Sequence, residues 1–138
     1  MTESSRPLSD ADYQTLARFR HALRVFLHFS EEAARSEGLT PAQHQLLLAV
    51  RGHPGEAAPA VGDLAEVLQT RTHSVVGLVD RAEEAGLVVS DRDASDSRRR
   101  LVSLTREGEA VLERLSDLHR RELRRFRAEM AQVLDELG

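Results

Sequence analysis

The sequence predicts a mainly α-helical protein with one small β-hairpin. Apolar residues recur at intervals of three and four along most of the chain, which is the periodicity of amphipathic helices. Two short runs rich in valine and leucine, LVVS at 87–90 and LVSLT at 101–105, flank a charged loop, as the strands of a hairpin do. The chain has 138 residues, 41% of them hydrophobic, which suits a single domain with its own core.

A long amphipathic helix is expected near the start of the chain. Ser9 and Asp12 match a capping box, and Gly38 lies where the pattern stops, so the helix should run to about Ser36. Its apolar stripe consists of Tyr13, Leu16, Phe19, Leu23, Phe26 and Leu27.

A second helix should follow directly. Thr40, Pro41 and Gln43 supply an N-cap, a first-turn proline and a reciprocal cap before the apolar run QLLLAV. Two prolines and two glycines mark residues 51–60 as a loop.

Two more helices precede the hairpin. Residues 61–68 form a short one, and after a break Thr72 is expected to cap a helix that Gly86 ends. The residues expected to face the core are Val61, Leu64, Ala65 and Leu68 in the first, and Val75, Val76, Leu78, Val79 and Ala82 in the second.

Helical structure is expected from the end of the hairpin to Leu137. Thr105 can cap it, and Glu107 and Glu109 fall in its first turn, where the helix dipole favours negative charge. One break is expected within residues 118–128.

Composition and charge narrow the function classes. Cysteine is absent, which excludes disulfides, thiolate metal sites and cysteine redox sensing. No apolar run is long enough to span a membrane, and the first residues do not resemble a signal peptide, so a soluble cytoplasmic protein is expected. The net charge is −4, yet residues 92–106 hold five arginines against two aspartates. Positive charge is thus concentrated at the predicted hairpin.

The order of elements is that of a winged helix-turn-helix flanked by helices. In such a module the second helix enters the DNA major groove and the hairpin, or wing, reaches the adjacent backbone or minor groove. The predicted recognition helix opens with side chains that can bond to base edges or phosphates: Arg71, Thr72, His73 and Ser74. A charged loop by itself is also typical of a solvated turn. Its position directly after the helix pair favours a wing that contacts DNA.

Residues 61–108 resemble the core of the MarR family of bacterial transcriptional regulators. The matching parts are VGDLAEVL, HSVVGLVDRAEEAGLV and a wing with aspartate, any residue and arginine, here Asp96, Ser97 and Arg98, leading into LVSLT and a glycine. The resemblance implies one MarR-like domain over residues 1–138. Its parts would be an N-terminal dimerisation helix at 1–38, the winged helix-turn-helix at 40–105 and C-terminal dimerisation helices at 106–138.

A homodimer is the second implication of the resemblance. The terminal helices carry more apolar positions than one small domain needs, namely Leu8, Tyr13, Leu16, Met130, Val133, Leu134 and Leu137. A two-fold dimer implies a double-stranded DNA operator that is pseudo-palindromic, with half-sites about 34 Å apart.

The resemblance also implies roles within the wing. By position, Asp96 would organise the hairpin by pairing with an arginine, for which Arg81 is the expected partner, and Arg98 would enter the minor groove. Phosphate contacts or solvent exposure are expected for the other wing arginines, Arg92, Arg99 and Arg100. Because side chains alternate along a strand, Arg99 and Arg100 should point to opposite faces and differ in role.

Members of the family bind small aromatic acids or similar compounds between the dimer helices and the winged helix, and some bind zinc. The candidate effector-binding residues are His21, His28 and His44, with structural or surface roles as the alternative. No cluster of histidine and carboxylate ligands occurs, so neither a metal nor another cofactor is predicted. We expect a repressor that a small aromatic or phenolic effector releases from its operator. An activator or a ligand-independent regulator is the alternative.

Other function classes fit less well. No nucleophile elbow, phosphate-binding glycine loop or metal-protease helix is present, so an enzyme is not expected. A winged helix that binds another protein through its charged wing remains an alternative. The arginines of residues 120–127 are interpreted as a solvated helix face, with a second DNA contact as the alternative.

Overall fold

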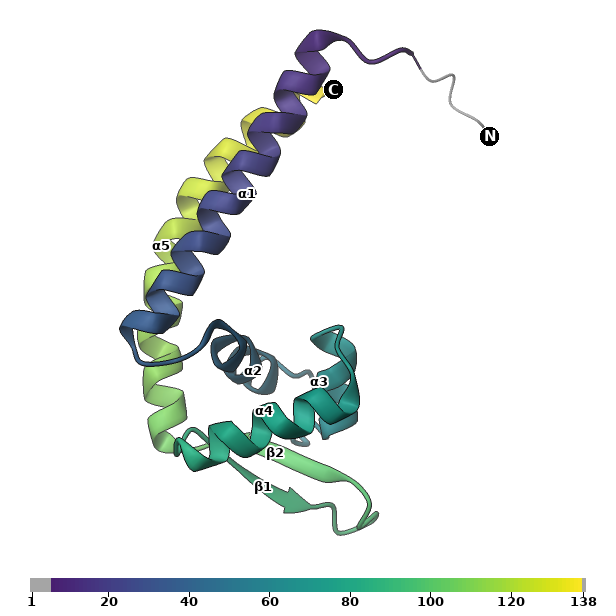
Figure 1. Ribbon diagram of the computed structural model, residues 1–138, viewed down its shortest axis with the longest axis vertical. Helices are drawn as coiled ribbons and strands as arrows, with labels where there is room; N and C mark the ends of the chain where they lie inside the picture. Colours follow the sequence, from purple (N-terminus) through teal and green to yellow (C-terminus); the bar gives the residue numbers. More distant parts are fainter. Residues whose placement is uncertain (1–5, 138) are drawn as a thin grey trace.

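The computed structural model describes residues 6–137 as five helices and a two-stranded antiparallel hairpin (Figure 1). The elements are α1 (Asp10–Ser36), α2 (Pro41–Arg51), α3 (Val61–Val67), α4 (Thr72–Glu84), β1 (Val88–Arg92), β2 (Arg100–Leu104) and α5 (Arg106–Leu137). Helices α1 and α5 lie side by side as a long stalk, and α2 to β2 form a winged body at one end of it. The predicted fold class, mainly α with a β-hairpin wing, is confirmed. No helix between residues 6 and 137 has the length and apolar character of a membrane span.

Most helix ends lie where the sequence predicts them. The Ser9 hydroxyl accepts the Asp12 N–H at 3.2 Å, and the Asp12 carboxylate accepts the Ser9 N–H at 2.9 Å. Thr40 and Gln43 form the same reciprocal cap on α2, at 3.1 and 3.0 Å. The glycines that follow α1 and α4 have positive φ, 80° at Gly38 and 77° at Gly86. Local capping chemistry therefore sets these boundaries.

Two predictions about helix ends are wrong. The N-cap of α4 is Arg71, which makes no side-chain capping bond, and Thr72 is the first helical residue. The break expected within residues 118–128 does not occur, because α5 is continuous. No proline or glycine lies between Glu109 and Leu137 to interrupt it. Phe126 in this stretch packs on Phe26 of α1, with ring centroids 5.2 Å apart.

The hydrophobic core lies in the winged body and includes the adjoining ends of α1 and α5. The larger side chains with almost no exposed surface are Leu46, Leu47, Leu64, Leu115, Val75, Val79, Val88 and Val102. Most inward positions predicted for α3 and α4 are buried, while Leu68 and Leu78 are half-buried. Val76 is the exception, since its side chain is exposed toward the wing.

The start of α5 is joined closely to the winged body. The Thr105 hydroxyl donates to the Gly86 carbonyl at 2.6 Å and accepts the Gly108 N–H at 3.0 Å, as expected of an N-cap. A Cβ at Gly108 would lie 2.1 Å from the Leu87 carbonyl oxygen. Only glycine allows α5 to leave the body along this path.

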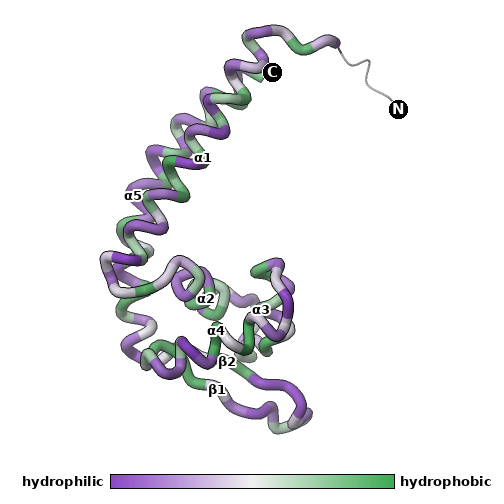
Figure 2. Tube along the Cα trace, viewed as in Figure 1, coloured by the Kyte–Doolittle hydropathy of each residue, from purple (hydrophilic) through white to green (hydrophobic). Residues whose placement is uncertain are grey.

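The outer part of the stalk buries much less apolar surface. Side chains that remain exposed there are Leu8, Tyr13, Leu16, Val25, Leu27, Leu118, Leu123, Leu134 and Leu137. Val133, one of the residues predicted at a dimer interface, is instead buried within its own chain. An ion pair between Arg18 and Glu136 joins α1 to α5 near the open end. Figure 2 shows that hydrophobic segments continue along both helices of the stalk, while the wing loop is hydrophilic.

Candidate nucleic-acid interface

A tight turn joins α3 to the predicted recognition helix, α4. Gln69 has a φ of 52°, the single positive value at a non-glycine position within residues 6–137. The Thr70 N–H donates to the Ala65 carbonyl at 3.0 Å and closes the turn. The chain therefore reverses within Leu68 to Arg71, as a helix-turn-helix requires.

The first residues of α4 are exposed and polar. Arg71, Thr72, His73 and Ser74 are all exposed, and within the described part of the chain their side chains form no hydrogen bond or ion pair with protein groups. Later turns of the same helix are anchored in the core. The free N–H groups and the positive end of the helix dipole lie at this exposed end, which suits a phosphate or a base edge.

Asp96 organises the wing loop. Its Oδ1 accepts the Arg98 backbone N–H at 3.1 Å and lies 3.2 Å from the Arg98 Nε, while its carbonyl accepts the Arg99 N–H at 3.0 Å. Ser95 donates both its N–H and its hydroxyl to Asp93, and these bonds, with a smaller contribution from Arg99, hold the pKa of Asp93 below its usual value. The loop is thus held by short-range bonds to two aspartates.

Arg81 does not pair with Asp96, so that expected ion pair is wrong. The Arg81 guanidinium lies back along α4, with Nη1 3.3 Å from the point where a Cβ on Gly77 would be. The carboxylate of Asp96 is already engaged within its own loop. The resemblance identified the aspartate that orders the wing, but the partner is Arg98 itself.

The arginines of the wing differ in what they contact. Arg98 is 90% exposed at the loop and its one ion-pair partner in the described chain is Asp96. Arg92 donates to the Ser97 carbonyl at 3.3 Å. Arg99 reaches Asp63 on α3 and Asp93, at 3.3 and 3.5 Å. Arg98 is therefore the arginine most available to an external anion.

Arg100 turns to a different helix from Arg99. Its Nη2 lies 2.8 Å from Asp80 and 3.5 Å from Glu83, both on α4. Its Nε donates to the Ser90 hydroxyl at 2.9 Å. This agrees with the expectation that the side chains of the two neighbouring arginines point in different directions.

A cleft of about 460 Å³ connects these parts, between the wing, α3 and the start of α4. Four predicted DNA-binding residues line it, namely Thr72, Arg92, Arg98 and Arg99. The structure does not bring Arg71, His73, Ser74, Arg81 or Asp96 into this lining. Asp63, for which no role was predicted, also lines the cleft, as does Arg100, which is paired within the chain and is not the solvent-exposed wing arginine that was expected. Their ion pairs join segments distant in sequence, so periodicity gives no signal for them.

A second cavity, of about 620 Å³, lies between α1, α2 and α5. Its apolar lining includes Phe26, Leu27, Leu48 and Leu123, and its basic lining consists of Arg120, Arg124 and Arg127. Its volume is in the range of small-molecule sites. Arg120 is paired with Asp117, so the combination of apolar walls with the guanidinium groups of Arg124 and Arg127 is what suits an amphipathic anion.

Two histidines meet at the wall of this cavity. The ring centroids of His44 and His119 lie 4.9 Å apart. His119 Nδ1 donates to the Leu115 carbonyl at 2.6 Å, because a carbonyl can only accept, and Nε2 lies 2.8 Å from the Ser30 hydroxyl. His44 is 3% exposed, and its Nδ1 has no hydrogen-bond partner in the described chain. Burial, followed by the nearby His119, lowers the pKa of His44.

Of the three histidines predicted to bind an effector, His44 alone lines this cavity. His21 lines a separate cleft of about 180 Å³ between α1 and α5, and His28 is exposed on α1. His119 was missed because its contacts cross from α5 to α1 and α2. Within residues 6–137, no group of three or more potential ligands is arranged to hold a metal ion.

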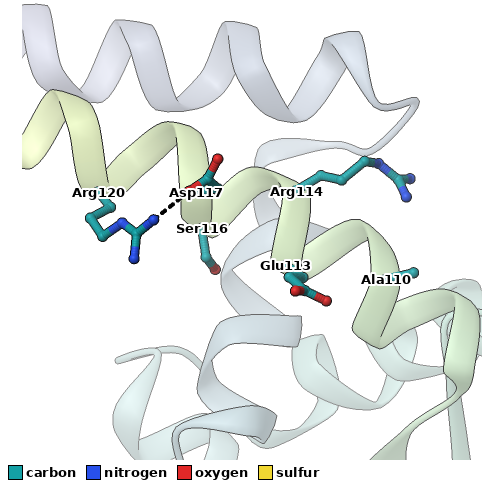
Figure 3. A pocket seen from close by; sticks show the side chains of 6 residues that line it. All are labelled: Ala110, Glu113, Arg114, Ser116, Asp117 and Arg120. Atoms are coloured by element: carbon teal, nitrogen blue, oxygen red, sulfur yellow. Dashed lines mark hydrogen bonds and ion pairs between the residues drawn. The ribbon is translucent and has the colours of Figure 1, made fainter.

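A third depression, of about 590 Å³, lies on the surface of α5 (Figure 3). Arg120 pairs with Asp117 at 2.7 Å (Figure 3). Arg114 pairs with Glu37 at 3.1 Å. Both arginines are neutralised within the chain, so this surface offers less to an anion than the cavity on the other side of Arg120.

The fold and the wing match known regulators. Residues 37–99 match the sequence profile of the MarR family. The transcriptional regulator HosA of Escherichia coli O127:H6 is 35% identical over 96 residues, which cover 67% of this chain and 67% of HosA. The chain belongs to the MarR family. The relatives are transcriptional regulators and not enzymes.

Solved structures of MarR-family proteins share this fold. AbsC, a MarR family transcriptional regulator from Streptomyces coelicolor, superposes with a TM-score of 0.75 and 23% identity, covering 96% of this chain and 90% of AbsC. MepR of S. aureus in complex with DNA gives a TM-score of 0.68 and 21% identity, covering 86% of this chain and 92% of MepR. This MarR-family regulator thus has the fold of a protein crystallised on DNA.

Proposed function

We propose that this chain is a homodimeric, sequence-specific DNA-binding regulator that acts in the cytoplasm on a pseudo-palindromic operator. The observation that carries the proposal is the state of Arg98, which is 90% exposed on a loop that Asp96 holds in place. An exposed cation on an ordered hairpin fits the negative potential of a narrow minor groove. The exposed residues 71–74 supply polar groups for the adjacent major groove.

The dimer is proposed from the stalk. Its exposed apolar side chains need a cover, and a second copy of the stalk offers the same surface in a two-fold arrangement. The two α4 helices would then face successive major grooves about 34 Å apart, with each wing at the adjacent minor groove. Pairing through the stalks would thus place two wings and two α4 helices on a pseudo-palindromic site.

Replacement of Arg98 tests the DNA proposal. We expect Arg98→Ala to weaken binding at least about tenfold to a duplex that the unmodified protein selects from random sequences, because a minor-groove arginine supplies both charge and shape recognition. The fold should be unchanged by circular dichroism. Arg35→Ala, which removes an exposed arginine from α1, is the matched control and should bind as the unmodified protein does. Equal affinity for both variants in a gel-shift titration would refute the wing assignment.

Salt dependence separates DNA recognition from protein recognition by the wing. Binding that neutralises phosphates releases counterions, so the affinity for the selected duplex should fall steeply as salt rises. Selection repeated with His73→Ala and Ser74→Ala then distinguishes contacts to bases from contacts to phosphates. A changed sequence preference indicates a base contact, whereas uniform weakening indicates a phosphate contact. A flat salt response would favour the protein-binding alternative.

Regulation by a small aromatic or phenolic effector is part of the proposal. The cavity between α1, α2 and α5 joins the stalk to the winged body, so a ligand there can favour one arrangement of the two over another. An aromatic ring would pack on Phe26 and Leu123, and an anionic group would face Arg124 and Arg127. The unpaired Nδ1 of His44 can receive or donate one further bond. Repression with release by the effector follows if the liganded dimer no longer matches the operator spacing.

Calorimetric titration with a panel of aromatic carboxylates and phenols tests this regulation. We expect at least one compound to bind, and Arg124→Ala to weaken its binding about tenfold through loss of a charge-assisted bond. His28 is exposed and lies outside the cavity, so His28→Ala serves as the control. The compound should also release the selected duplex. Binding with no effect on DNA would support a ligand-independent regulator, and tighter DNA binding would support an activator.

A further inference from the structure

We propose that Arg100 is a positioning residue for DNA binding, which holds the wing against α4 so that Arg98 is presented to the groove, and that Arg100 does not itself contact DNA. This rests on the proposed function in DNA recognition.

The first support is the set of contacts that Arg100 makes. Its side chain is 21% exposed, against 90% for Arg98 two residues earlier. Nη2 lies 2.8 Å from Asp80 Oδ1 and 3.5 Å from Glu83 Oε2. Nε donates to the Ser90 hydroxyl at 2.9 Å, and that hydroxyl donates to Glu83. One guanidinium thus joins β2, β1 and α4.

The second support is the place of this network in the fold. The base of the hairpin is fixed by Val88 and Val102 in the core and by the Val102 N–H, which donates to the Pro59 carbonyl at 2.9 Å. Arg100 lies at the other end of the ladder, opposite Arg92 and next to the loop. The bond from there to α4 is one of the links that hold the loop end of the hairpin, together with the bridge between Leu101 and Ala60 and the ion pair between Arg99 and Asp63 of α3.

The third support is charge. Arg100 faces two carboxylates, Asp80 and Glu83, so its positive charge is neutralised within the protein. A phosphate would have to replace these partners. Arg98, by contrast, has one aspartate partner and a side chain that is 90% exposed. The planar fork of arginine can bind a carboxylate and a hydroxyl at once, which the single ammonium of lysine cannot reproduce.

The test measures binding of unmodified protein and variants to the selected duplex over a range of salt concentrations. We expect Arg100→Gln to lower the affinity about tenfold at moderate salt, with the slope of log affinity against log salt unchanged, because no phosphate contact is lost. Arg100→Lys should not restore the affinity. If Arg100 contacts a phosphate, the slope falls by about one unit, and that result would overturn the proposal.

Asp80 supplies an opposite-sign test. Removing a negative charge near DNA should strengthen binding if Asp80 is only a bystander. We expect Asp80→Asn to weaken it instead, and the double variant with Arg100→Gln to bind no worse than the weaker single variant, because both changes break one network. Stronger binding by Asp80→Asn, or additive losses, would overturn the role of Arg100.

Amide hydrogen exchange gives a readout that does not depend on DNA. The Asp93 and Arg99 N–H groups are bonded within the wing, to the Arg99 and Asp96 carbonyls. We expect both to exchange faster in Arg100→Gln and to be unaffected in Arg98→Ala. Unchanged exchange of these two N–H groups in Arg100→Gln would refute the positioning role of Arg100 and leave the proposed DNA binding unaffected. If exchange is faster in Arg100→Gln but the unmodified protein binds no duplex, the proposed function is refuted, and with it the role of Arg100 in DNA binding.

Discussion

The winged body and the stalk differ in how much of their apolar side-chain surface is buried within the chain. In the body, leucines and valines from α2, α3, α4, the hairpin and the start of α5 are almost fully enclosed. Along the outer stalk, Thr15, Ala22 and Val133 are buried, and many leucines remain exposed. The body is stabilised by its own chain, whereas the stalk lacks the layer of packing that long amphipathic helices need.

The difference in burial suits two different roles, presentation of the wing by the body and pairing with a second chain by the stalk. A self-sufficient body can hold the wing in a fixed geometry, with Asp96 ordering the loop and Arg100 joining it to α4. In the proposed dimer, a stalk completed by a second copy can change its packing while the geometry within each body is kept. The cavity with His44 and His119 lies where the two parts meet, which is where a ligand would affect both.

The largest expected effect comes from truncating a side chain in the body. Leu47 has no exposed surface, while Leu48 beside it on α2 is 47% exposed. We expect Leu47→Ala to lower the free energy of unfolding by about 2–5 kcal/mol through lost burial and a cavity. Leu48→Ala should change it by less than about 0.5 kcal/mol. Urea unfolding at one protein concentration measures both. Similar losses for the two variants would show that the body is not self-sufficient.

The next effect tests the stalk. Leu134 on α5 is 61% exposed and Val67 on α3 is 63% exposed, so the single chain does not distinguish them. If a second stalk covers Leu134, an arginine there buries a charge at the interface, and we expect Leu134→Arg to weaken dimerisation at least about tenfold. Val67→Arg should have no such effect. Sedimentation velocity at micromolar concentration gives both results, and identical behaviour of the two variants would place the dimer interface elsewhere.

In both regions, what the sequence predicted depends on whether the signal is local. Capping patterns at Ser9 and Thr40, the glycine at 86 and the valine- and leucine-rich runs of the hairpin are local, and they predicted the elements correctly. The link between Arg100 and Asp80 and the contact between His44 and His119 join distant segments, so no local pattern indicates them. The continuity of α5 was not predicted, because charged residues dominate its middle and its packing on α1 through Phe126 leaves no local signal.

The smallest expected effect concerns pH at the junction of body and stalk. Burial, followed by the charge of His119, lowers the pKa of His44 in the folded chain below its ordinary value of 6.5. The unfolded chain therefore binds the proton more readily, so the stabilising effect of a neutral His44 is complete above about pH 6.5 and is lost as pH falls through the folded pKa.

Comparison of variants isolates that contribution. We expect the Tm of the unmodified protein to fall more steeply between about pH 7 and pH 5 than the Tm of His44→Gln, which cannot take up the proton. Carboxylates whose pKa is lowered, such as Asp93 and Glu136, titrate in both proteins and cancel in the difference. His28→Gln removes an exposed imidazole from α1 and should keep the slope of the unmodified protein. A steeper slope in His44→Gln would contradict the expected sign and would mean that protonation of His44 strengthens, not weakens, the junction.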